Sequence, residues 1–579
     1  MKHNRTIPMI TMIAAGCLCL LALVGRRAPA EQQSKPDPTL VGFWPLRNAA
    51  TDASGHKLDG QIHGGGLRFE SLNGGVSSAQ FPGRGHWIEV PDCKELQLGT
   101  GDFSMAVMVQ TPTPLNDTIG DILCKFDKRT RRGINLSIMQ SGGSCTSMAN
   151  TRNLFFGIDA AKMRPWRDCG RPGQAILIFG LAVYEGDLYA ATYEGGADEA
   201  GHVYRYHGGQ NWEDCGSPDL CNSVMSLAVH DGKLYAGTAR YNAKGSHLAT
   251  SLNVHDGGKA FRYEGGRQWI DCGKVGLAEC TWGMMEYDGV LFASLMDSPN
   301  DQNRSGQGLY AYRGGRTWEY CGNPGGRLAA LSVYDGHLFA SGYDGGKVGG
   351  LFRYDGDHKW TNFGPPPGVT QTYSCAVSGG ELHVGTWPDG KVFTCLGPNN
   401  WINAGRLGEE KEVMGLAVYN GMLYGGTLPL AQVYRRDIDS TWALTGRLDM
   451  TPDVEYRRAW TMAVFDGKLF CGVLPSGHVW SLESGKAVTY DKALAPGWRH
   501  IAAVKEKGFL KLYVDGKRIA TSTEFKPEEF DLSNDAPLKI GFGEHDYFKG
   551  SMRNLYLFKR ALSDAEVLRM HRMRMGSQK

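Results

Sequence analysis

The sequence predicts an all-β fold, and three observations support this class. Glycine accounts for 79 of the 579 residues, which is about twice its ordinary share. A short phrase, apolar–Asp/Asn/Glu/Gly–Gly–any residue–Leu–aromatic or His, occurs in seven copies between residues 183 and 473. A second phrase, which contains a Gly-rich turn and a tryptophan, follows most of these copies. Frequent tight turns between short apolar segments are typical of many-stranded all-β proteins.

Each copy of the first phrase predicts a β-hairpin. Examples are VHDGKLYAGT (229–238) and VYNGMLYGGT (418–427). Asp-Gly and Asn-Gly readily adopt the positive φ angles of a two-residue turn, and the flanking residues are apolar enough for buried strands. We therefore expect two strands from every copy.

The second phrase adds two more strands, as in VYRYHGGQNWEDCG (203–216). Its tryptophans after the hairpins are Trp212, Trp269, Trp318, Trp360, Trp401 and Trp442. A seventh, Trp166, precedes the first hairpin. A four-stranded repeat of about this length is one blade of a β-propeller. Because the seventh tryptophan precedes the first hairpin, the sequence predicts a seven-bladed propeller over 161–485. Its last blade would pair the strand near Trp166 with the strand near Trp480.

The turn before each tryptophan, as in RYEGGRQW and RYDGDHKW, resembles the turns of kelch and Asp-box repeats. The leading Ser or Thr of an Asp box is absent, and the acidic residue is not constant. We interpret the resemblance as turn chemistry, without implying the sialidase activity found among Asp-box propellers.

The segments on either side of the repeats each look incomplete. LVGFWPLRNAATDASG (40–55) and FSMAVMVQTPT (103–113) resemble the first half of a LamG-like (concanavalin A-like lectin/glucanase) jelly roll. GWRHIAAVKEKGFLKLYVDGKRIATS (497–522) resembles its second half. The resemblance implies one jelly-roll sandwich, formed by 40–160 and 486–575 and interrupted by the propeller. Residues 563–566 match a capping box, which predicts a short helix after the last strand.

This arrangement fits the requirement that an inserted domain has neighbouring ends. Here the chain would enter the propeller at the start of an outer strand and leave it at the end of the neighbouring strand. Its entry and exit points would therefore lie on the same face. The opposite face then stays open.

Residues 1–30 predict export. An apolar stretch from Ile7 to Gly25 follows two basic residues, and Ala28-Pro29-Ala30 forms a small-residue cleavage site. A cleaved signal peptide, an uncleaved membrane anchor and a lipoprotein signal at Cys17 are the three alternatives. Residues 31–39 would form a linker. We expect a secreted, periplasmic or cell-surface location, with contact to a membrane only through an anchor.

Export permits disulfide bonds. Cys215 and Cys221 are close in sequence, as are Cys272 and Cys280, and each pair predicts a bridge within a loop. The alternative is a set of buried free thiols. Because no Cys-x-x-Cys pair occurs, we do not expect a zinc site.

Several aromatic residues map to the open face of the propeller. The expected ligand-binding residues are Tyr193, Trp282, Tyr343, Tyr373, Trp387, Arg458 and Trp460. Aromatic rings there would stack on sugars or hold a peptide. The alternative is that they fill the central channel or pack between blades.

The resemblance to LamG-like domains also implies calcium. Asp52, Glu544 and Asp546 would supply carboxylate oxygens from loops of the jelly roll. The alternative is that they are ordinary turn residues.

The sequence favours a binding protein. The formal net charge is only +2 and no run of five like charges occurs, so we expect no nucleic-acid partner. No catalytic motif stands out, so we name no catalytic residues. We expect a glycan or an extracellular protein as the partner. The alternative is a propeller glycoside hydrolase or lyase, with the jelly roll as a lectin-like accessory domain.

Overall fold

The computed structural model describes residues 37–72, 76–142, 144–196, 198–297, 306–343 and 349–575. The predicted signal segment lies outside the described residues. Nearly all regular structure is β-strand, as the sequence predicts, and the one α-helix among the described residues is α1 (Asp564–Met575). No helix within the described ranges is long and apolar enough to cross a membrane. The described part of the chain also contains the short 3-10 helices η1 (Lys94–Leu96), η2 (Ala243–Ser246), η3 (Ile438–Ser440) and η4 (Pro527–Glu529).

Two large sheets form a concanavalin-like sandwich. The first, sheet A, has the order β3 (Arg68–Leu72), β4 (Val76–Pro82), β43 (Lys549–Phe558), β6 (Phe103–Thr111), β39 (Gly497–Glu506), β40 (Phe509–Val514) and β41 (Lys517–Thr521), and β1 (Leu40–Trp44) also pairs with β43. Sheet B has the order β2 (Gln61–His63), β5 (Trp87–Val90), β42 (Leu538–Ile540), β7 (Gly120–Asp127), β8 (Arg132–Ser141), β9 (Asn150–Met163) and β38 (Ser484–Tyr490).

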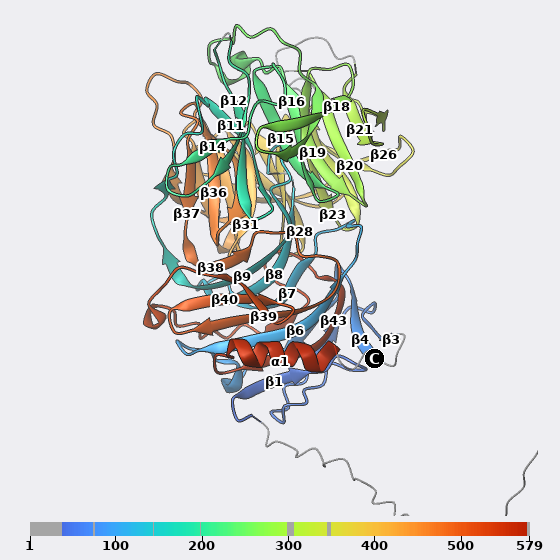
Figure 1. Ribbon diagram of the computed structural model, residues 1–579, viewed down its shortest axis with the longest axis vertical. Coiled ribbons are helices and arrows are strands. Elements are labelled where there is room, and N and C mark those ends of the chain that lie inside the picture. Colours follow the sequence, from blue (N-terminus) through green and yellow to red (C-terminus); the bar gives the residue numbers. More distant parts are fainter. Residues whose placement is uncertain are drawn as a thin grey trace, which may run out of the picture. The chain divides into compact units, whose positions relative to one another are not determined.

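Strands from both ends of the chain share these sheets. In sheet A, β6 lies between β43 and β39, and in sheet B, β9 pairs with β38. One buried cluster fills the space between the sheets, with Trp44, Phe103 and Phe156 among its largest members. The predicted capping box is present, because the Ser563 backbone N–H donates to Glu566 Oε2 at 2.9 Å. Helix α1 packs on the outer face of sheet A, in front of β6 and β39 (Figure 1).

The strands from β10 to β37 form a propeller-like arrangement of four-stranded antiparallel units. Three units are joined into one larger sheet by the single pairs Tyr193–Ser223 and Ala239–Cys280. They consist of β11 (Leu177–Tyr184), β12 (Asp187–Tyr193), β13 (Val203–Tyr206), β14 (Trp212–Asp214); β15 (Ser223–His230), β16 (Lys233–Ala239), β17 (Lys259–Gly265), β18 (Gln268–Lys274); and β19 (Cys280–Tyr287), β20 (Val290–Met296), β21 (Gly308–Tyr312), β22 (Trp318–Tyr320).

The other units are separate four-stranded sheets. They consist of β23 (Arg327–Tyr334), β24 (His337–Tyr343), β25 (Gly349–Tyr354), β26 (Trp360–Asn362); β27 (Gln371–Ser378), β28 (Glu381–Trp387), β29 (Lys391–Gly397), β30 (Asn400–Arg406); β31 (Glu412–Tyr419), β32 (Met422–Leu428), β33 (Gln432–Arg436), β34 (Trp442–Arg447); and β35 (Arg458–Phe465), β36 (Lys468–Leu474), β37 (Val479–Leu482), β10 (Arg167–Asp168).

The first two strands of each unit are joined by the hairpin turn that the sequence predicts. At the turn between β15 and β16, Asp231 and Gly232 have φ angles of 47° and 66°. Positive φ at both central residues matches the right-handed twist of the two strands. An Asp tolerates this conformation because its short side chain accepts local hydrogen bonds.

The expected pairing of segments near Trp166 and Trp480 is present. In the last unit, Arg167 lies opposite Ser481 and Asp168 opposite Trp480. Strand β10 precedes all other strands of this arrangement in sequence, and its partner β37 is the last of them. The unit is therefore built from segments about 310 residues apart, the separation of Asp168 and His478, which interact at 2.9 Å.

Tryptophans link each unit to its neighbour. Six indole Nε1 groups donate to a backbone carbonyl in the outer strand of the adjacent unit, or directly after it, over 2.9–3.3 Å. The pairs are Trp212–Cys169, Trp269–Cys215, Trp318–Cys272, Trp360–Cys321, Trp401–Phe363 and Trp442–Ala404. Trp166 Nε1 donates to Thr445 Oγ1 at 3.2 Å. The recurring cysteines thus mark the position whose carbonyl accepts the next tryptophan.

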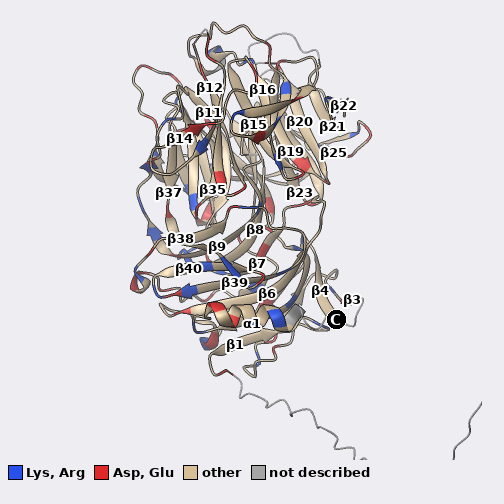
Figure 2. Cartoon of the chain, in the orientation of Figure 1, with Lys and Arg blue, Asp and Glu red and all other residues tan. Residues whose placement is uncertain are grey.

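Several hairpin turns of the propeller dock directly on the jelly roll. The Gly379 backbone N–H donates to the Glu544 carbonyl at 2.9 Å, and the Gly186 N–H donates to the Asp491 carbonyl at 3.0 Å. Because these hydrogen bonds join backbone groups, the contact between the two parts of the chain does not depend on side-chain conformation. Lys, Arg, Asp and Glu are scattered over both parts without a large single-sign region in this view (Figure 2).

Candidate functional site

The centre of the propeller is filled by one apolar cluster. In the first strand of every unit the pairing register shifts, and the third residue falls within that irregularity. These third residues are Phe179, Met225, Trp282, Ala329, Tyr373, Met414 and Trp460. All belong to the same buried cluster. A bulge redirects a side chain and frees backbone groups from the ladder, so one local irregularity, repeated around the axis, builds this central cluster.

Most of the predicted ligand-binding residues are part of this cluster. Tyr193, Trp282 and Trp460 are at most 1 % exposed, and Tyr373 and Arg458 are 6 % exposed. Trp387 is half-buried at the edge of the cluster. Strand β24 ends at Tyr343, whose side chain lies outside the described part. The burial favours the packing role of these residues, and their contact with a ligand stays a prediction.

A loop of the jelly roll closes the channel from the other side. Residues 144–149 connect β8 and β9 and are buried. Thr146 Oγ1 donates to the Phe179 carbonyl at 2.8 Å, and Ser147 Oγ accepts from the Leu227 N–H at 3.0 Å. The loop's hydroxyl groups therefore satisfy backbone groups at or next to the bulged strands. This loop was not predicted from the sequence, although its Ser/Thr-rich composition between two apolar strands is a signal.

Two charged residues lie beside the aromatic cluster. Glu412 and Arg458 are the first residues of the neighbouring strands β31 and β35. Burial raises the pKa of Glu412 to about 8, although the positive charge of Arg458 opposes this shift. The Arg458 guanidinium lies 5.1 Å from the Trp460 ring centroid. This pair places a buried carboxyl group and a guanidinium beside the aromatic cluster.

The loop between β16 and β17 reaches the loop before β35. His247 Nδ1 lies 2.5 Å from Glu455 Oε2, and its ring is 4.7 Å from that of Tyr456. Ala243, in η2 of the same loop, is fully buried in the aromatic cluster. Together these contacts hold the loop against the cluster, which explains why the aromatic residues predicted to bind a ligand are covered.

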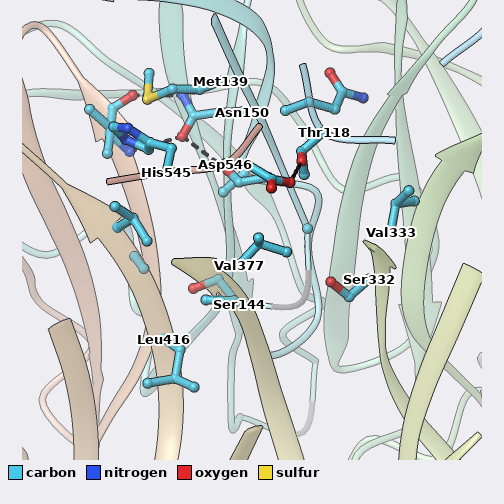
Figure 3. A pocket seen from close by; sticks show the side chains of 18 of the residues that line it. Thr118, Met139, Ser144, Asn150, Ser332, Val333, Val377, Leu416, His545 and Asp546 are labelled. Carbon is cyan, nitrogen blue, oxygen red and sulfur yellow. Dashed lines mark hydrogen bonds between the residues drawn. The ribbon is translucent and has the colours of Figure 1, made fainter. Parts of the chain in front are cut away.

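A small cavity lies where the jelly roll meets the propeller (Figure 3). It has a volume of about 60 Å³ and is lined by residues from both parts, including Asn150, Val377, His545 and Asp546. Thr118 Oγ1 donates to Asp546. Burial, followed by the negative charge of Asp117, raises the pKa of Asp546 well above its usual value. This volume suits a few water molecules rather than an organic ligand.

The residues predicted to bind calcium have different partners. Asp52 accepts hydrogen bonds from the backbone N–H groups of Phe43, Ser54 and Leu58. Glu544 forms an ion pair with Lys128. No group of three or more His, Cys, Asp and Glu side chains with metal-binding geometry occurs among the described residues. The structure therefore does not bring Asp52, Glu544 and Asp546 together, and calcium binding stays a prediction.

The predicted disulfide bonds are absent, so that prediction from the sequence was wrong. All four cysteines involved are buried free thiols. Cys215 packs in one apolar cluster, and Cys221 Sγ lies 3.5 Å from the Ser223 carbonyl. Cys272 and Cys280 belong to two different clusters. Closeness in sequence was misleading for Cys272 and Cys280 because the fold places them in different apolar clusters.

A groove of about 630 Å³ lies on the outer face of sheet A. Alternate residues of its strands, such as Phe81, Val109 and Ile501, face the sandwich core. Because side chains of a strand alternate between faces, their neighbours lie on the opposite face. Direct cross-strand pairs place one residue from each of five adjacent strands in a row: Arg68, Gln80, Ser551, Gln110 and Trp498.

Four of these five residues, all except Trp498, line the groove. With a strand spacing near 4.8 Å, the row spans about 19 Å. Lys549, His86 and Thr111 add further polar groups to the lining. Trp498 is half-buried and extends the row beyond the groove. Amide, hydroxyl and aromatic groups on a flat, rigid sheet can bind the hydroxyl groups and apolar faces of sugar rings.

This groove was not predicted from the sequence. The polar members stand out as alternating positions in strands that otherwise have apolar residues, such as Gln80 in AQF and Gln110 in VQT. Which strands are neighbours cannot be read from the sequence, since β43 lies more than 400 positions from the strands it joins. The row exists only after the two ends of the chain pair.

Comparison with known families supports the identity of the sandwich. Residues 454–568 match the sequence profile of the concanavalin A-like lectin/glucanases superfamily. The match includes strands β38 to β43 and begins just before β35. No curated protein sequence matches this chain.

Solved structures that align with this chain share little sequence with it. A streptogramin B lyase is 12 % identical, with a TM-score of 0.42, and the alignment covers 55 % of this chain and 97 % of the lyase. A catalytically inactive virginiamycin B lyase from Staphylococcus aureus with quinupristin is 11 % identical, with a TM-score of 0.42 and coverages of 55 % and 99 %. The extracellular domain of a hybrid two-component system from B. thetaiotaomicron is 11 % identical, with a TM-score of 0.37 and coverages of 70 % and 61 %.

Proposed function

We propose that this chain is an exported carbohydrate-binding protein that holds its ligand in the sheet A groove. A seven-bladed propeller is inserted into the jelly roll between β9 and β38, and it acts mainly as a rigid support. The domain boundaries proposed are 40–160 and 486–575 for the jelly roll and 161–485 for the propeller. The signal segment at 1–30 directs export.

The contacts between units support the seven-bladed ring. The first strands contact one another in the order β11, β15, β19, β23, β27, β31 and β35, and β35 contacts β11 again. The tryptophan hydrogen bonds follow the same order around the outside. The chain enters this arrangement after β9 and leaves it before β38, and those two strands are paired. Paired entry and exit strands are what insertion of one domain into another requires.

The observation that carries the function is the row of Arg68, Gln80, Ser551, Gln110 and Trp498 across five strands. Its side chains stand on sheet positions fixed by backbone pairing, so a ligand meets a surface that is already organised. The protein then loses little conformational entropy when the ligand binds. The propeller channel is a weaker alternative because its aromatic residues are buried at both ends by loops.

The residues favour binding over hydrolysis. Retaining and inverting glycosidases use two carboxyl groups that flank the scissile bond. The described lining of the groove contains no Asp or Glu. Beside the channel cluster, Glu412 is buried and Glu455 is already paired with His247. We therefore place the hydrolase or lyase alternative second.

A protein partner is a second candidate function, favoured by an apolar surface on the propeller. Leu220, Leu252 and Val254 are 64–75 % exposed. Asn253 Nδ2 donates to the Leu220 carbonyl at 2.8 Å, which holds the two segments side by side. Exposed apolar side chains that cluster on one loop surface are typical of protein contacts.

A glycan array tests the proposal. The full mature chain is applied with 2 mM CaCl₂ or with EDTA, beside the variants Trp498→Ala and Gln110→Ala. We expect glycan signals that both variants reduce, by roughly tenfold for the loss of an aromatic contact. The control is Trp269→Phe, which leaves the groove intact. Loss of every signal for the folded wild type would contradict the proposal, and an effect of EDTA would support calcium binding.

A further inference from the structure

We propose that the sheet A groove selects acidic saccharides, which carry carboxylate or sulfate groups, over neutral ones. This inference rests on the proposed function, because it names the chemistry of the ligand at the same groove. It depends on the charges that line the groove and on a buried arginine beside it.

The groove has a cationic lining. Arg68 and Lys549 line it together with His86, whereas no Asp or Glu is among its described lining residues. Arg68 is exposed and occupies the first position of the row. Two acids lie close to these groups: the exposed Glu70 accepts a 2.6 Å hydrogen bond from Gln80, and Asp117 lies 3.8 Å from Lys549. Every charged side chain among the described lining residues is nevertheless basic, and Arg68 is exposed to an approaching ligand.

Arg553 provides a second and independent observation. It is 1 % exposed, and its Nε and Nη2 atoms have no hydrogen-bond partner in the described part of the chain. The guanidinium lies 4.6 Å from the centroid of the Trp498 ring. Burial, together with the like charge of Arg47, lowers its pKa. The protein thus buries a cation without supplying an anion.

Energetics decide between a structural and a ligand-related role for Arg553. A cation–π contact offsets only part of the free energy that desolvation of an unpaired charge costs. Trp498 therefore does not compensate for the burial of Arg553. An anionic group from the ligand would do so, and charge-assisted hydrogen bonds to a guanidinium are among the strongest available.

The position of Arg553 connects it to the row. It lies two residues after Ser551 on β43, opposite Met108, which precedes Gln110 by two residues on β6. Residues two apart on a strand share a face and lie about 7 Å apart, a distance that an arginine side chain spans. Trp498, which covers Arg553, is itself opposite Gln110. A ligand that displaces or tilts this ring would reach the guanidinium from the groove.

Calorimetric titration tests the inference with four probes: tetragalacturonate, a chondroitin sulfate tetrasaccharide, cellotetraose and a 20-base-pair DNA duplex. The full mature protein is titrated in 50 and 300 mM NaCl. We expect at least one acidic saccharide to bind ten times more tightly than cellotetraose, and the added salt to weaken it. The two acidic probes distinguish carboxylate from sulfate recognition.

Variants connect the selectivity to these residues. Arg68→Ala should weaken acidic-saccharide binding roughly two- to fivefold, as expected for an exposed charge. Arg553→Gln should weaken it about tenfold or more. Arg129→Ala, which removes a cation with a 68 % exposed side chain outside the groove, should leave it unchanged. If Arg553→Gln does not fold, the exposed Arg68→Ala variant still tests the inference.

Four results would overturn it. Cellotetraose binding as tightly as both acidic saccharides would remove the selectivity, and DNA binding as tightly would reduce it to general charge attraction. Unchanged acidic binding in both Arg68→Ala and Arg553→Gln would exclude these cations. Glycan-array signals restricted to neutral sugars would reject the acidic class but keep the proposed function, whereas an array without any signal would reject the proposed function itself.

Discussion

The indole of Trp166 donates a 3.2 Å hydrogen bond to Thr445 Oγ1, which lies 279 positions further along the chain. The six other linking tryptophans donate to backbone carbonyls of a neighbouring unit, whereas this one reaches a side-chain hydroxyl. Trp166 also belongs to the strand segment that completes the last unit. The contact therefore joins the start of the propeller segment to its sixth unit, next to the last unit, where β10 pairs with β37.

Replacing Trp166 should weaken the contact between the last unit and the sixth unit. We expect Trp166→Ala to lower the free energy of unfolding by roughly 2–3 kcal/mol, because a half-buried ring and its hydrogen bond are lost. Trp166→Phe should cost about 1 kcal/mol, since it keeps most of the ring. Urea unfolding measures both values. Trp212→Ala, which removes a linking tryptophan from another unit, is the matched control. If Trp212→Ala lowers the stability and Trp166→Ala does not, the contact of Trp166 with Thr445 does not help to hold the last unit in place.

The loop that enters the channel depends on a close approach at Gly180. A Cβ atom at this position would collide with Ser147 Oγ. We expect Gly180→Ala to lower the unfolding free energy by roughly 1–3 kcal/mol, because the loop must move away from the bulged strand. Gly65→Ala is the control, since nothing lies within 4 Å of the position that its methyl group would occupy. Equal stability of the two variants, measured by thermal unfolding, would show that the loop is not packed this tightly.

Glu412 should make stability depend on pH. Its folded pKa of about 8 lies above the unfolded value of 4.5, so the folded state holds the proton more tightly. The stability that Glu412 contributes is then present below pH 4.5 and is lost as the pH rises to 8. Glu412→Gln cannot ionise and should gain roughly 1–3 kcal/mol over the wild type between pH 5 and pH 9.

Chemical denaturation at several pH values gives this difference directly. Glu409→Gln, whose side chain is 92 % exposed in the wild type, should show no such change. A difference between Glu412→Gln and wild type that is independent of pH would mean that Glu412 ionises normally.

Thiol counting tests the corrected cysteine assignment. Of the twelve described cysteines, Cys93 alone is half-buried and the others are buried. We expect Ellman's reagent to label about one thiol in the native mature protein, and all twelve after unfolding in the absence of reductant. Fewer thiols in the unfolded protein would indicate disulfides after all, and mass spectrometry of the labelled chain would locate them.

Much of the fold follows from local sequence patterns. Asp231-Gly232 and its equivalents encode hairpins through backbone conformation alone, and the offset of Trp166 predicts which distant strand completes the last unit. Capping by Ser563 and Glu566 is equally local. These features depend on a few neighbouring residues, so a single sequence reveals them.

The site residues were harder to predict because exposure is a property of the assembled fold. Trp282 and Trp460 look like a binding surface until bulges turn them inward and the loop at 144–149 and that of His247 cover them. Arg553 and Gln110 become neighbours only when the ends of the chain pair in sheet A. Burial of Cys272 and Cys280 in separate clusters likewise depends on packing that sequence spacing does not contain.

Hydrogen–deuterium exchange with the tightest glycan found on the array tests the binding groove most directly. We expect slower exchange in peptides that cover Val76–Pro82, Phe103–Thr111 and Lys549–Phe558, and no change in the propeller loops at 242–258 and 449–457. Protection of those propeller loops, with sheet A unchanged, would contradict binding in the groove.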